Sequence, residues 1–274
     1  MRPQSSDPFF ALLQGHIDLG RAALLIAQQA RPELEIEHYI ECLDQLAEGF
    51  RIRHPQMRSG AVAVSALNEY LFGELGFRGN RANYDDPTNS YLDEVLDRRL
   101  GIPITLSLVY IEVGNRLNLS LSGVNFPYHF LVRCDAVSEP IFIDPFANGQ
   151  LLSPLQLADR LPVVDGVQLP LEDRYLQPAS SRDILTRILR NLKRIHTYNR
   201  QLKDAICCGE RMALLEPEEA DNYRDLGFLY YRTRECQKSL NAFEHYLRWV
   251  VEAPDADEIR QNIQVISNRL GILN

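Results

Sequence analysis

The stretch that decides the fold is residues 98–146, which read RRLGIPITLSLVYIEVGNRLNLSLSGVNFPYHFLVRCDAVSEPIFIDPF. Gly101 permits a sharp turn, and Pro103 favours the first turn of a helix that is apolar nearly all the way round. Such a helix is buried in the centre of a domain. Residues 122–133 and 140–144 then have the apolar pattern of β-strands. The stretch therefore predicts a buried helix followed by a hairpin.

The two predicted strands carry one histidine and one aspartate, His129 and Asp144, among apolar neighbours. Residues 135–139 suit a hairpin connection, and a hairpin centred midway between residues 136 and 137 places His129 across from Asp144. An aspartate in that position fixes the tautomer and orientation of the imidazole. The alternatives are a buried histidine held by one hydrogen bond and a carboxylate that caps the IDPF turn.

This pair outlines half of a cysteine-hydrolase site, but the expected nucleophile position holds no cysteine. That position is the start of the buried helix, where the helix dipole lowers the pKa of a thiol. Thr105 and Ser107 offer only hydroxyls, which are weaker nucleophiles without strong activation. Alternatively, both hydroxyls bond back to the preceding helical turn. Cys134 follows His129 by five residues, so strand alternation directs it to the opposite face.

The composition predicts a cytoplasmic protein with room for two domains. The chain has 274 residues, of which 45% are hydrophobic and 24% charged. A net charge of −8 disfavours general binding to nucleic acid or anionic membranes. The five cysteines are scattered, as is typical of reduced thiols. The sequence contains no recognisable signal peptide, membrane-spanning run or metal-ligand spacing, and we expect no cofactor.

Helices are predicted on both sides of the central stretch. Before it, apolar spacing predicts three helices, over 7–29, 33–53 and 61–75. Turn-forming residues follow, and Asn89 or Ser90 is expected to cap the next helix.

The expected organisation has two domains. The division is a first domain over 1–162, a linker over 163–181 and a helical domain over 182–274 that ends in a capping helix. Parts of the proline-rich region after residue 146 are also able to pack on the first domain as short strands or turns.

The helical domain contains an internal period of 34 residues, which aligns Leu192 with Leu226 and Ala205 with Ser239. The segment YRDLGFLYY (223–231) matches much of the tetratricopeptide pattern. Small residues in this pattern let two helices approach closely, and aromatic residues fill the space between them. The match is good in the second unit and loose in the first.

Several side chains are candidates for binding a partner. Residues 182–203 are rich in arginine and lysine, which indicates either a solvated helix face or a basic stripe for an acidic peptide or, less favourably, RNA. The candidate binding residues on the two domains are Asn125, Tyr128, Arg187, Arg190, Arg194, Tyr223 and Tyr230.

Taken together, the run YDDPTNSYLDEVLDRRLGIPITLSLVYIEVGNRL, then GVNFPYHFLVR and IDPF, resembles the bacterial SirB-type proteins of the transglutaminase-like superfamily. The resemblance spans nearly the whole chain and is strongest over 77–146. It implies an α+β, papain-like core, in which a central helix packs on an antiparallel sheet, followed by all-α tetratricopeptide helices.

The resemblance also implies a site. In the wider superfamily, a cysteine at the helix start, a histidine on one strand and an aspartate on the next form a triad; His129 and Asp144 match the last two. The cysteine position falls near Pro103–Thr105 and has no thiol. Tyr128 stands where the SirB-type pattern usually has a small residue, so we expect it to narrow the cleft.

Three hypotheses follow for function. The favoured one is a non-catalytic protein that binds a protein or peptide through its cleft and its helical repeats. The second is a hydrolase or acyl transferase that uses Thr105 or Ser107 with His129 as base and Asp144 as orienting group. The third is an RNA-associated factor that uses the basic stripe. The sequence makes no prediction about the oligomeric state.

Overall fold

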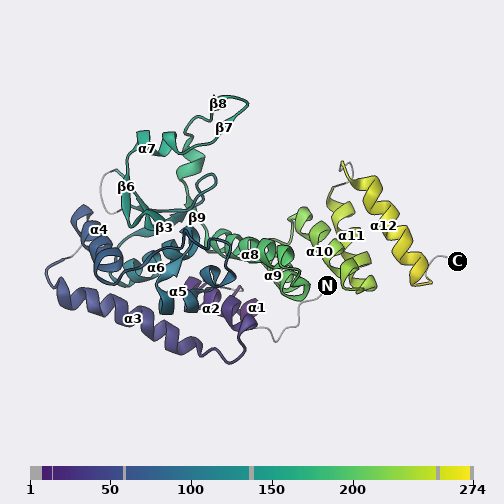
Figure 1. Ribbon diagram of the computed structural model, residues 1–274, viewed down its shortest axis with the longest axis horizontal. Coiled ribbons are helices and arrows are strands. Elements are labelled where there is room, and N and C mark those ends of the chain that lie inside the picture. The colour runs from purple at the N-terminus through teal and green to yellow at the C-terminus, as the bar shows by residue number, and fades with distance from the viewer. Residues whose placement is uncertain (1–7, 14, 58–59, 136–138, 251–253, 272–274) are drawn as a thin grey trace. The chain divides into compact units, whose positions relative to one another are not determined.

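The computed structural model describes residues 8–13, 15–57, 60–135, 139–250 and 254–271 (Figure 1). Internal contacts divide the chain into two compact units. The first, Gly15–Ile188, contains the stretch quoted above, and the second combines residues 1–14 with Leu189–Asn274. The predicted fold class, an α+β part followed by an all-helical repeat part, is confirmed.

The first unit is built on an antiparallel five-stranded sheet in the order β6-β5-β4-β3-β9. Its strands are β3 (Leu121–Val124), β4 (Leu131–Cys134), β5 (Ile141–Asp144), β6 (Gln150–Leu152) and β9 (Pro178–Ala179). The edge strand β9 lies in the region predicted to be a linker. That region therefore contributes to the sheet, and the division of the chain into 1–162, 163–181 and 182–274 stays a prediction.

The predicted central helix is α6 (Pro103–Arg116), which packs against β3 and β4. Apolar residues from Ile104 to Val113 are almost fully buried, in agreement with their all-round apolar pattern. Gly114 permits the close approach of helix and sheet, because a Cβ atom there would collide with Leu121. The end of the helix is thus held close to the sheet.

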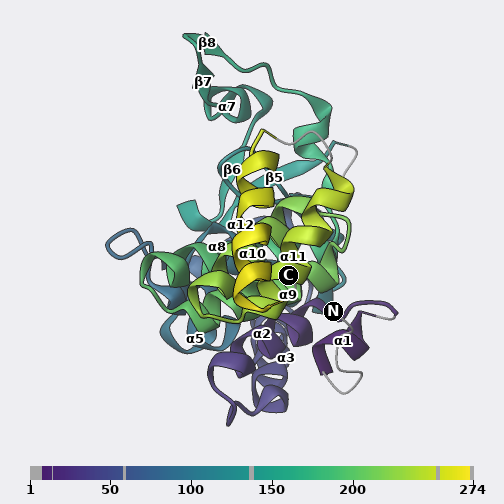
Figure 2. The same cartoon turned by 90° about the vertical axis from the view of Figure 1, so that its right-hand side faces the viewer.

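A second apolar layer contacts the sheet through Phe142 and Leu131, which cluster with Leu157 and Leu161. It includes α7 (Pro154–Asp159) and a 3-10 turn at Asp173–Leu176. The hairpin of β7 (Val163–Val164) and β8 (Val167–Gln168) between them is exposed. Within this unit, the hairpin and α3 lie on opposite sides of the sheet in both views (Figures 1 and 2).

The N-terminal prediction of one helix over 7–29 is wrong. The chain forms α1 (Pro8–Leu12) and, separately, α2 (Leu19–Ala30). Asp18 caps α2, because its carboxylate accepts a hydrogen bond from the Arg21 amide at 3.0 Å. The apolar spacing over residues 7–29 did not indicate that a separate helix begins after Asp18.

The other predicted N-terminal helices are present. They are α3 (Ile36–Arg53), α4 (Ala61–Asn68) with a π-helical turn at Glu69–Glu74, and α5 (Leu92–Arg98). Two short strands pair in parallel: β1 (Arg78–Gly79), which precedes α5, and β2 (Leu100–Gly101), which follows it.

The prediction of a single strand over 122–133 is also wrong. Pro127 and Tyr128 reverse the chain, Tyr128 adopts a left-handed φ of 57°, and the His129 amide donates to the Phe126 carbonyl at 3.0 Å. The region is therefore a hairpin, β3 and β4. His129 lies in its bend and not in a strand.

The predicted register between β4 and β5 is shifted. Val132 pairs with Ile143, which places Asp144 in line with Leu131 and not with residue 129. The expected centre of the connection, near residues 136–137, lies outside the described residues. The observed pairing differs from the predicted one by two residues, and the bend separately removes residue 129 from the strand.

The second unit contains the tetratricopeptide helices. They are α8 (Ser181–Tyr198), which begins in the first unit, α9 (Leu202–Leu215), α10 (Ala220–Arg232), α11 (Cys236–Trp249) and α12 (Ala256–Arg269). The bounds of α9 and α11 differ by 34 residues at both ends, in agreement with the period found in the sequence.

Close packing between α10 and α11 follows the predicted pattern. Gly227 leaves no room for a Cβ atom against the Phe243 ring, and the buried Ser239 hydroxyl donates to the Gly227 carbonyl at 2.7 Å. No helix in the described ranges is long and apolar enough to cross a membrane.

Candidate functional site

His129 and Asp144 lie together although their predicted register is wrong. The Nε2 atom of His129 is 3.0 Å from Oδ2 of Asp144, and their side chains are 21% and 2% exposed. The His129 bend carries the imidazole to the end of β5, where Asp144 is located. Nε2 is buried and lacks a hydrogen bond of good angular geometry, so the contact is best described as an ion-pair contact that depends on histidine protonation.

Asp144 serves two roles at once. One carboxylate oxygen, Oδ1, accepts hydrogen bonds from the backbone amides of Phe146 at 3.0 Å and Ala147 at 3.2 Å, and so caps the 3-10 turn that follows. The other, Oδ2, faces His129 and an ion-paired Arg160. Burial alone would raise the pKa of Asp144, but the interactions with His129 and then Arg160 outweigh it and lower this pKa.

The sequence analysis did not identify Arg160, which is the residue that follows α7. Its guanidinium binds the Asp144 carboxylate and also donates to Oε1 of Gln150 at 3.1 Å. Arg160 lies 16 residues after Asp144, a separation with no local pattern that would join the two. The Asp144 oxygen that contacts His129 therefore also binds the Arg160 guanidinium, a cation that a catalytic triad does not require.

Thr105 and Ser107 are fully buried in the first turns of α6. The Thr105 hydroxyl donates to the Asn89 carbonyl at 2.7 Å and accepts from the Ile102 amide at 3.1 Å. The Ser107 hydroxyl has no hydrogen-bond partner within the described residues. In this part of the chain, neither hydroxyl forms a hydrogen bond with His129.

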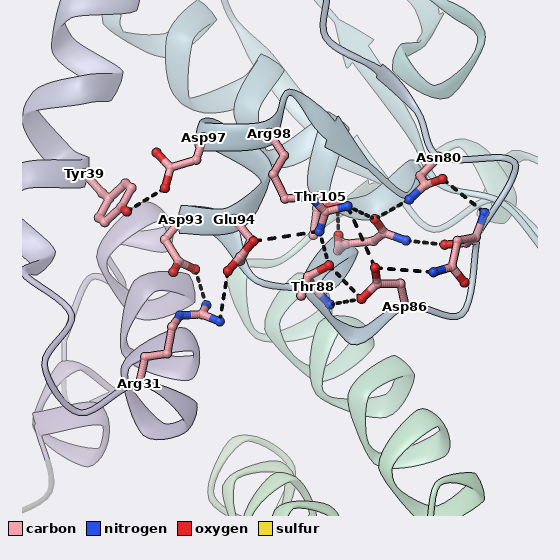
Figure 3. Close-up of polar contacts among 12 residues, drawn as sticks. Arg31, Tyr39, Asn80, Asp86, Thr88, Asp93, Glu94, Asp97, Arg98 and Thr105 are labelled. Atoms are coloured by element: carbon pink, nitrogen blue, oxygen red, sulfur yellow. Dashed lines mark hydrogen bonds and ion pairs between the residues drawn. The ribbon is translucent and has the colours of Figure 1, made fainter.

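Asn89 organises the loop over the start of α6 through contacts with Asn80, Arg98 and Thr105. These three partners are labelled in Figure 3. Neither Asn89 nor Ser90 caps α5 as predicted. The side-chain amide nitrogen of Asn89 donates to the carbonyls of Asn83 at 2.7 Å and Tyr84 at 3.2 Å. Its side-chain oxygen accepts from Asn80 at 3.0 Å and from Arg98 at 3.2 Å.

The pairing of β1 with β2 attaches this loop to the helix start. Gly79 is in register with Gly101, and the Asn80 amide donates to the Gly101 carbonyl at 2.9 Å. Strands of two residues leave no periodic signal, so sequence analysis could not find them. The nucleophile position of the superfamily is consequently covered by a hydrogen-bonded loop.

One aromatic side chain, that of Phe146, contacts the imidazole of His129. The His129 and Phe146 rings meet edge to face with centroids 6.3 Å apart, and Tyr84 contacts Phe146 in the same way at 5.9 Å. The Arg81 guanidinium lies 4.7 Å from the centre of the Phe146 ring. Tyr128 is 87% exposed, so the expected narrowing of a cleft by its side chain is not observed.

None of the five cysteines is in a disulfide, and none is a partner of His129 in the described chain. Cys134 is buried at the end of β4, in register with Leu121 and Ile141. Among the described residues, no group of three or more metal-ligating side chains is suitably placed for a metal ion.

The candidate binding residues separate into different environments. Asn125 is exposed and accepts a hydrogen bond from Arg187 at 3.3 Å, and Arg187 also lies over the Phe130 ring. Tyr223 is half-buried and stacks on His245 with centroids 3.7 Å apart. Tyr230 is 1% exposed and donates to Glu210, so it is a packing residue and is not available at the surface.

Arg190 and Arg194 are different, because both line a pocket of about 810 Å³ in the second unit. The pocket is formed mainly by one face of α8 and one face of α10. Its lining residues are Arg190, Lys193, Arg194, Thr197, Tyr198, Met212, Glu219, Asp221, Asn222, Asp225, Phe228, Leu229 and Arg232.

Comparison with known families gives the same two parts. The transglutaminase-like superfamily model matches residues 37–190, and a tetratricopeptide-repeat model matches residues 192–264. Fold and site thus define a transglutaminase-like core followed by tetratricopeptide helices. The chain belongs to the UPF0162 family: a UPF0162 protein of Xylella fastidiosa is 35% identical over 256 residues, which cover 92% of this chain and 91% of that protein.

Two further relatives extend this picture. Protein SirB1 of Salmonella typhimurium is 25% identical and covers 92% of this chain and 93% of its own, which confirms the SirB-type resemblance. Human F-box only protein 21 is 29% identical over 55% of this chain, but over only 28% of its own length. Among solved structures, menin matches with a TM-score of 0.38 and 12% identity over 94% of this chain and 72% of its own, a level that does not indicate a shared fold.

Proposed function

We propose that this chain is a non-catalytic transglutaminase-like protein that binds a protein or peptide partner, with the tetratricopeptide unit as the main binding part. The observation that carries the proposal is the environment of Thr105. Its hydroxyl proton is donated to the Asn89 carbonyl, and the hydroxyl also accepts from the Ile102 amide. An attacking oxygen needs its proton directed to a base, and here a buried backbone carbonyl takes it.

The His129–Asp144 pair supports the second hypothesis, a hydrolase or acyl transferase, because an oriented imidazole is a competent general base. Ser107 does not supply the missing nucleophile, since its hydroxyl is fully buried and has no hydrogen bond to a base in the described residues. Arg160 further compensates the carboxylate that would stabilise an imidazolium. These contacts favour the non-catalytic function.

Basic residues of the predicted stripe support RNA binding poorly. Arg187 is bonded to Asn125, and Lys193 is paired with Asp225 at 2.7 Å. A continuous track of free cations, which a phosphate backbone needs, is therefore interrupted.

Comparison of the full chain with its His129→Ala variant tests the absence of catalysis. Both proteins are incubated with p-nitrophenyl acetate and with a glutamine-containing peptide, and nitrophenol and ammonia release are measured. We expect both rates to equal the buffer rate. Turnover by the unmodified chain that falls by about 100-fold or more in the variant would contradict the proposal. Coincident thermal unfolding curves serve as the folding control.

A further inference from the structure

The imidazole of His129 can be reached from solvent, unlike the two hydroxyls at the start of α6. Its side chain is 21% exposed, whereas Thr105 and Ser107 are fully buried. Its Nδ1 atom is not fully buried and forms no hydrogen bond with the described residues. Because no cysteine stands at the start of the helix, this nitrogen is the nucleophile that the core site presents to solvent.

The carboxylate of Asp144 determines which nitrogen of the ring is nucleophilic. Its Oδ2 atom lies 3.0 Å from Nε2 of His129, and its Oδ1 atom is held by the backbone amides of Phe146 and Ala147. A carboxylate beside Nε2 favours the tautomer with a proton on Nε2, which leaves the lone pair on Nδ1. The same carboxylate stabilises the positive charge that develops on the ring when Nδ1 forms a bond.

The charges around this imidazole favour an anionic reagent over a neutral one. Arg160 binds Asp144, and the exposed Arg81 lies 4.7 Å from the centre of the Phe146 ring, which His129 also contacts. Among the described residues, no carboxylate other than that of Asp144 contacts the imidazole or either guanidinium. Two guanidinium groups and one carboxylate thus accompany the neutral ring, which leaves an excess of positive charge.

Acidic residues near these arginines in the sequence do not cancel that excess. Asp86 accepts hydrogen bonds from the amide and the hydroxyl of Thr88 at 2.9 and 2.7 Å, and it lies 3.9 Å from Arg98. Asp85 is exposed and already interacts within the chain. Asp159 is exposed and forms no ion pair with a described residue.

This charge balance distinguishes between two classes of group that an imidazole accepts. A phosphoryl group carries nearly two negative charges at neutral pH and accepts hydrogen bonds from guanidinium groups, whereas an acyl group adds no charge. On Nδ1 of His129, a phosphoryl group would find the guanidinium of Arg81 against the same aromatic ring.

We propose that Nδ1 of His129 accepts a phosphoryl group from a donor in which phosphorus is bonded to nitrogen. The Nδ1 lone pair attacks phosphorus, the P–N bond of the donor breaks, and the donor nitrogen, which is already protonated, leaves as a neutral amine. The ring keeps its Nε2 proton, so its new positive charge lies beside Asp144, and Arg81 donates to the phosphoryl oxygens.

Such a transfer exchanges one P–N bond for another, so it needs no large driving force and no further nucleophile. It goes beyond the proposed binding function, because it makes the core a site at which a binding protein is modified. The protein is changed once per transfer and does not turn over a substrate.

Incubation of the full chain with phosphoramidate near neutral pH tests the inference. Intact-mass spectrometry counts the phosphoryl groups, and peptide mapping in alkali, where phosphohistidine is stable, locates them. We expect one phosphoryl group per chain at early times, on His129. The exposed His38 of α3 reports the rate of an imidazole without a carboxylate partner in the described chain. Modification of His129 should be about tenfold faster or more, since charge-assisted contacts have effects of that size.

Variants of the full chain separate the roles of the neighbouring groups. Asp144→Asn should slow the transfer by about tenfold, and Arg81→Ala by about threefold or more, because each removes a charge that stabilises the product. Arg78→Ala is the matched control and should change the rate by less than about 1.5-fold. Arg78 is exposed, and strand alternation directs it away from Phe146, which Gly79 faces.

Two further controls complete the experiment. His129→Ala should abolish the adduct at this position, and the unfolding curves of both arginine variants should match that of the unmodified chain. N-phosphoimidazole in place of phosphoramidate distinguishes two sources of the same chemistry. Faster transfer from N-phosphoimidazole assigns the donor as a phosphohistidine of another protein, and faster transfer from phosphoramidate assigns it as a small phosphorylated amine.

Three results would overturn the inference: no adduct on His129, an adduct that forms no faster there than on His38, or equal rates for Arg81→Ala and Arg78→Ala. Each of them would leave the proposed binding function standing. Repeated release of inorganic phosphate that depends on His129 would instead contradict the proposed non-catalytic function, while it would support phosphoryl transfer to this residue.

Discussion

The site of the transglutaminase-like core and the pocket of the repeats treat their polar groups in opposite ways. In the core, Asp144 is 2% exposed and receives His129, Arg160 and two backbone amides. In the repeats, Arg190 and Arg232 are exposed without ion-pair partners in the described chain. The difference teaches that one unit can use its charged groups in internal contacts while an attached unit leaves charged groups exposed to solvent.

Among the substitutions that test this comparison, Asn89→Ala is expected to have the largest effect on the free energy of unfolding. Asn89 is fully buried and its side chain holds four hydrogen bonds of the covering loop. Because several buried groups lose partners, we expect the free energy of unfolding to fall by about 3 kcal/mol. Urea unfolding measures this, with the exposed Asn83→Ala as control. Equal stability of the two variants would show that the loop network does not close the core.

Arg160→Ala is expected to cause the next largest loss in the free energy of unfolding. It leaves a buried carboxylate with less compensation, but Arg160 is itself 30% exposed, so we expect a loss of about 2 kcal/mol. Urea unfolding midpoints provide the measurement. Substitutions at exposed positions usually change the free energy of unfolding by less than about 0.5 kcal/mol. A change of that size here would mean that the Arg160–Asp144 ion pair contributes no more to stability than a surface ion pair.

Asp144→Asn tests the charge of the same group through pH. The folded state lowers the pKa of Asp144, so its contribution is present above the ordinary value of 3.8 and is lost as pH falls through the folded pKa. We expect the variant to be less stable by about 1–2 kcal/mol near pH 7 and this difference to shrink below about pH 4. Urea unfolding at both pH values measures it. A difference that grows on acidification would contradict the assigned direction.

The smallest effect is expected for R190A/R194A on stability. Both side chains are exposed, so the free energy of unfolding should change by less than about 0.5 kcal/mol. Thermal and urea unfolding would reveal a larger loss, which would mean that these arginines support the fold. Together with Arg160→Ala, this variant compares the replacement of arginine by alanine at an ion-paired, partly buried position and at two exposed positions.

Much of the fold was predictable because its signals are local. The apolar α6, the tetratricopeptide period and the spacing of Gly227 and Ser239 are periodic patterns, and all are present in the structure. The His129–Asp144 contact was predicted by an argument that was wrong in register and that placed His129 in a strand, where the chain instead bends at Tyr128. The contact arises because the bend and the end of β5 meet at the same end of the sheet.

The rest of the site depends on contacts that carry no local pattern. Arg160 reaches Asp144 from the end of α7, and β9 joins the sheet through two residues that include a proline. Asn89 looked like a helix cap, because its residue type favours both caps and loops. Only the paired strands β1 and β2 decide between the two, and at two residues each they are too short to be recognised.

The way in which the two units take their buried residues from the chain also determines where the protein can be truncated without loss of packing. The first unit runs to Ile188 and uses Ile184, near Gly123, from within α8. The second unit takes Phe9, fully buried with Arg211 over its ring, from the opposite end of the chain. A truncation at residue 182 would therefore remove packing from both products: the core would lose the first turns of α8, and the repeats would lose their N-terminal segment.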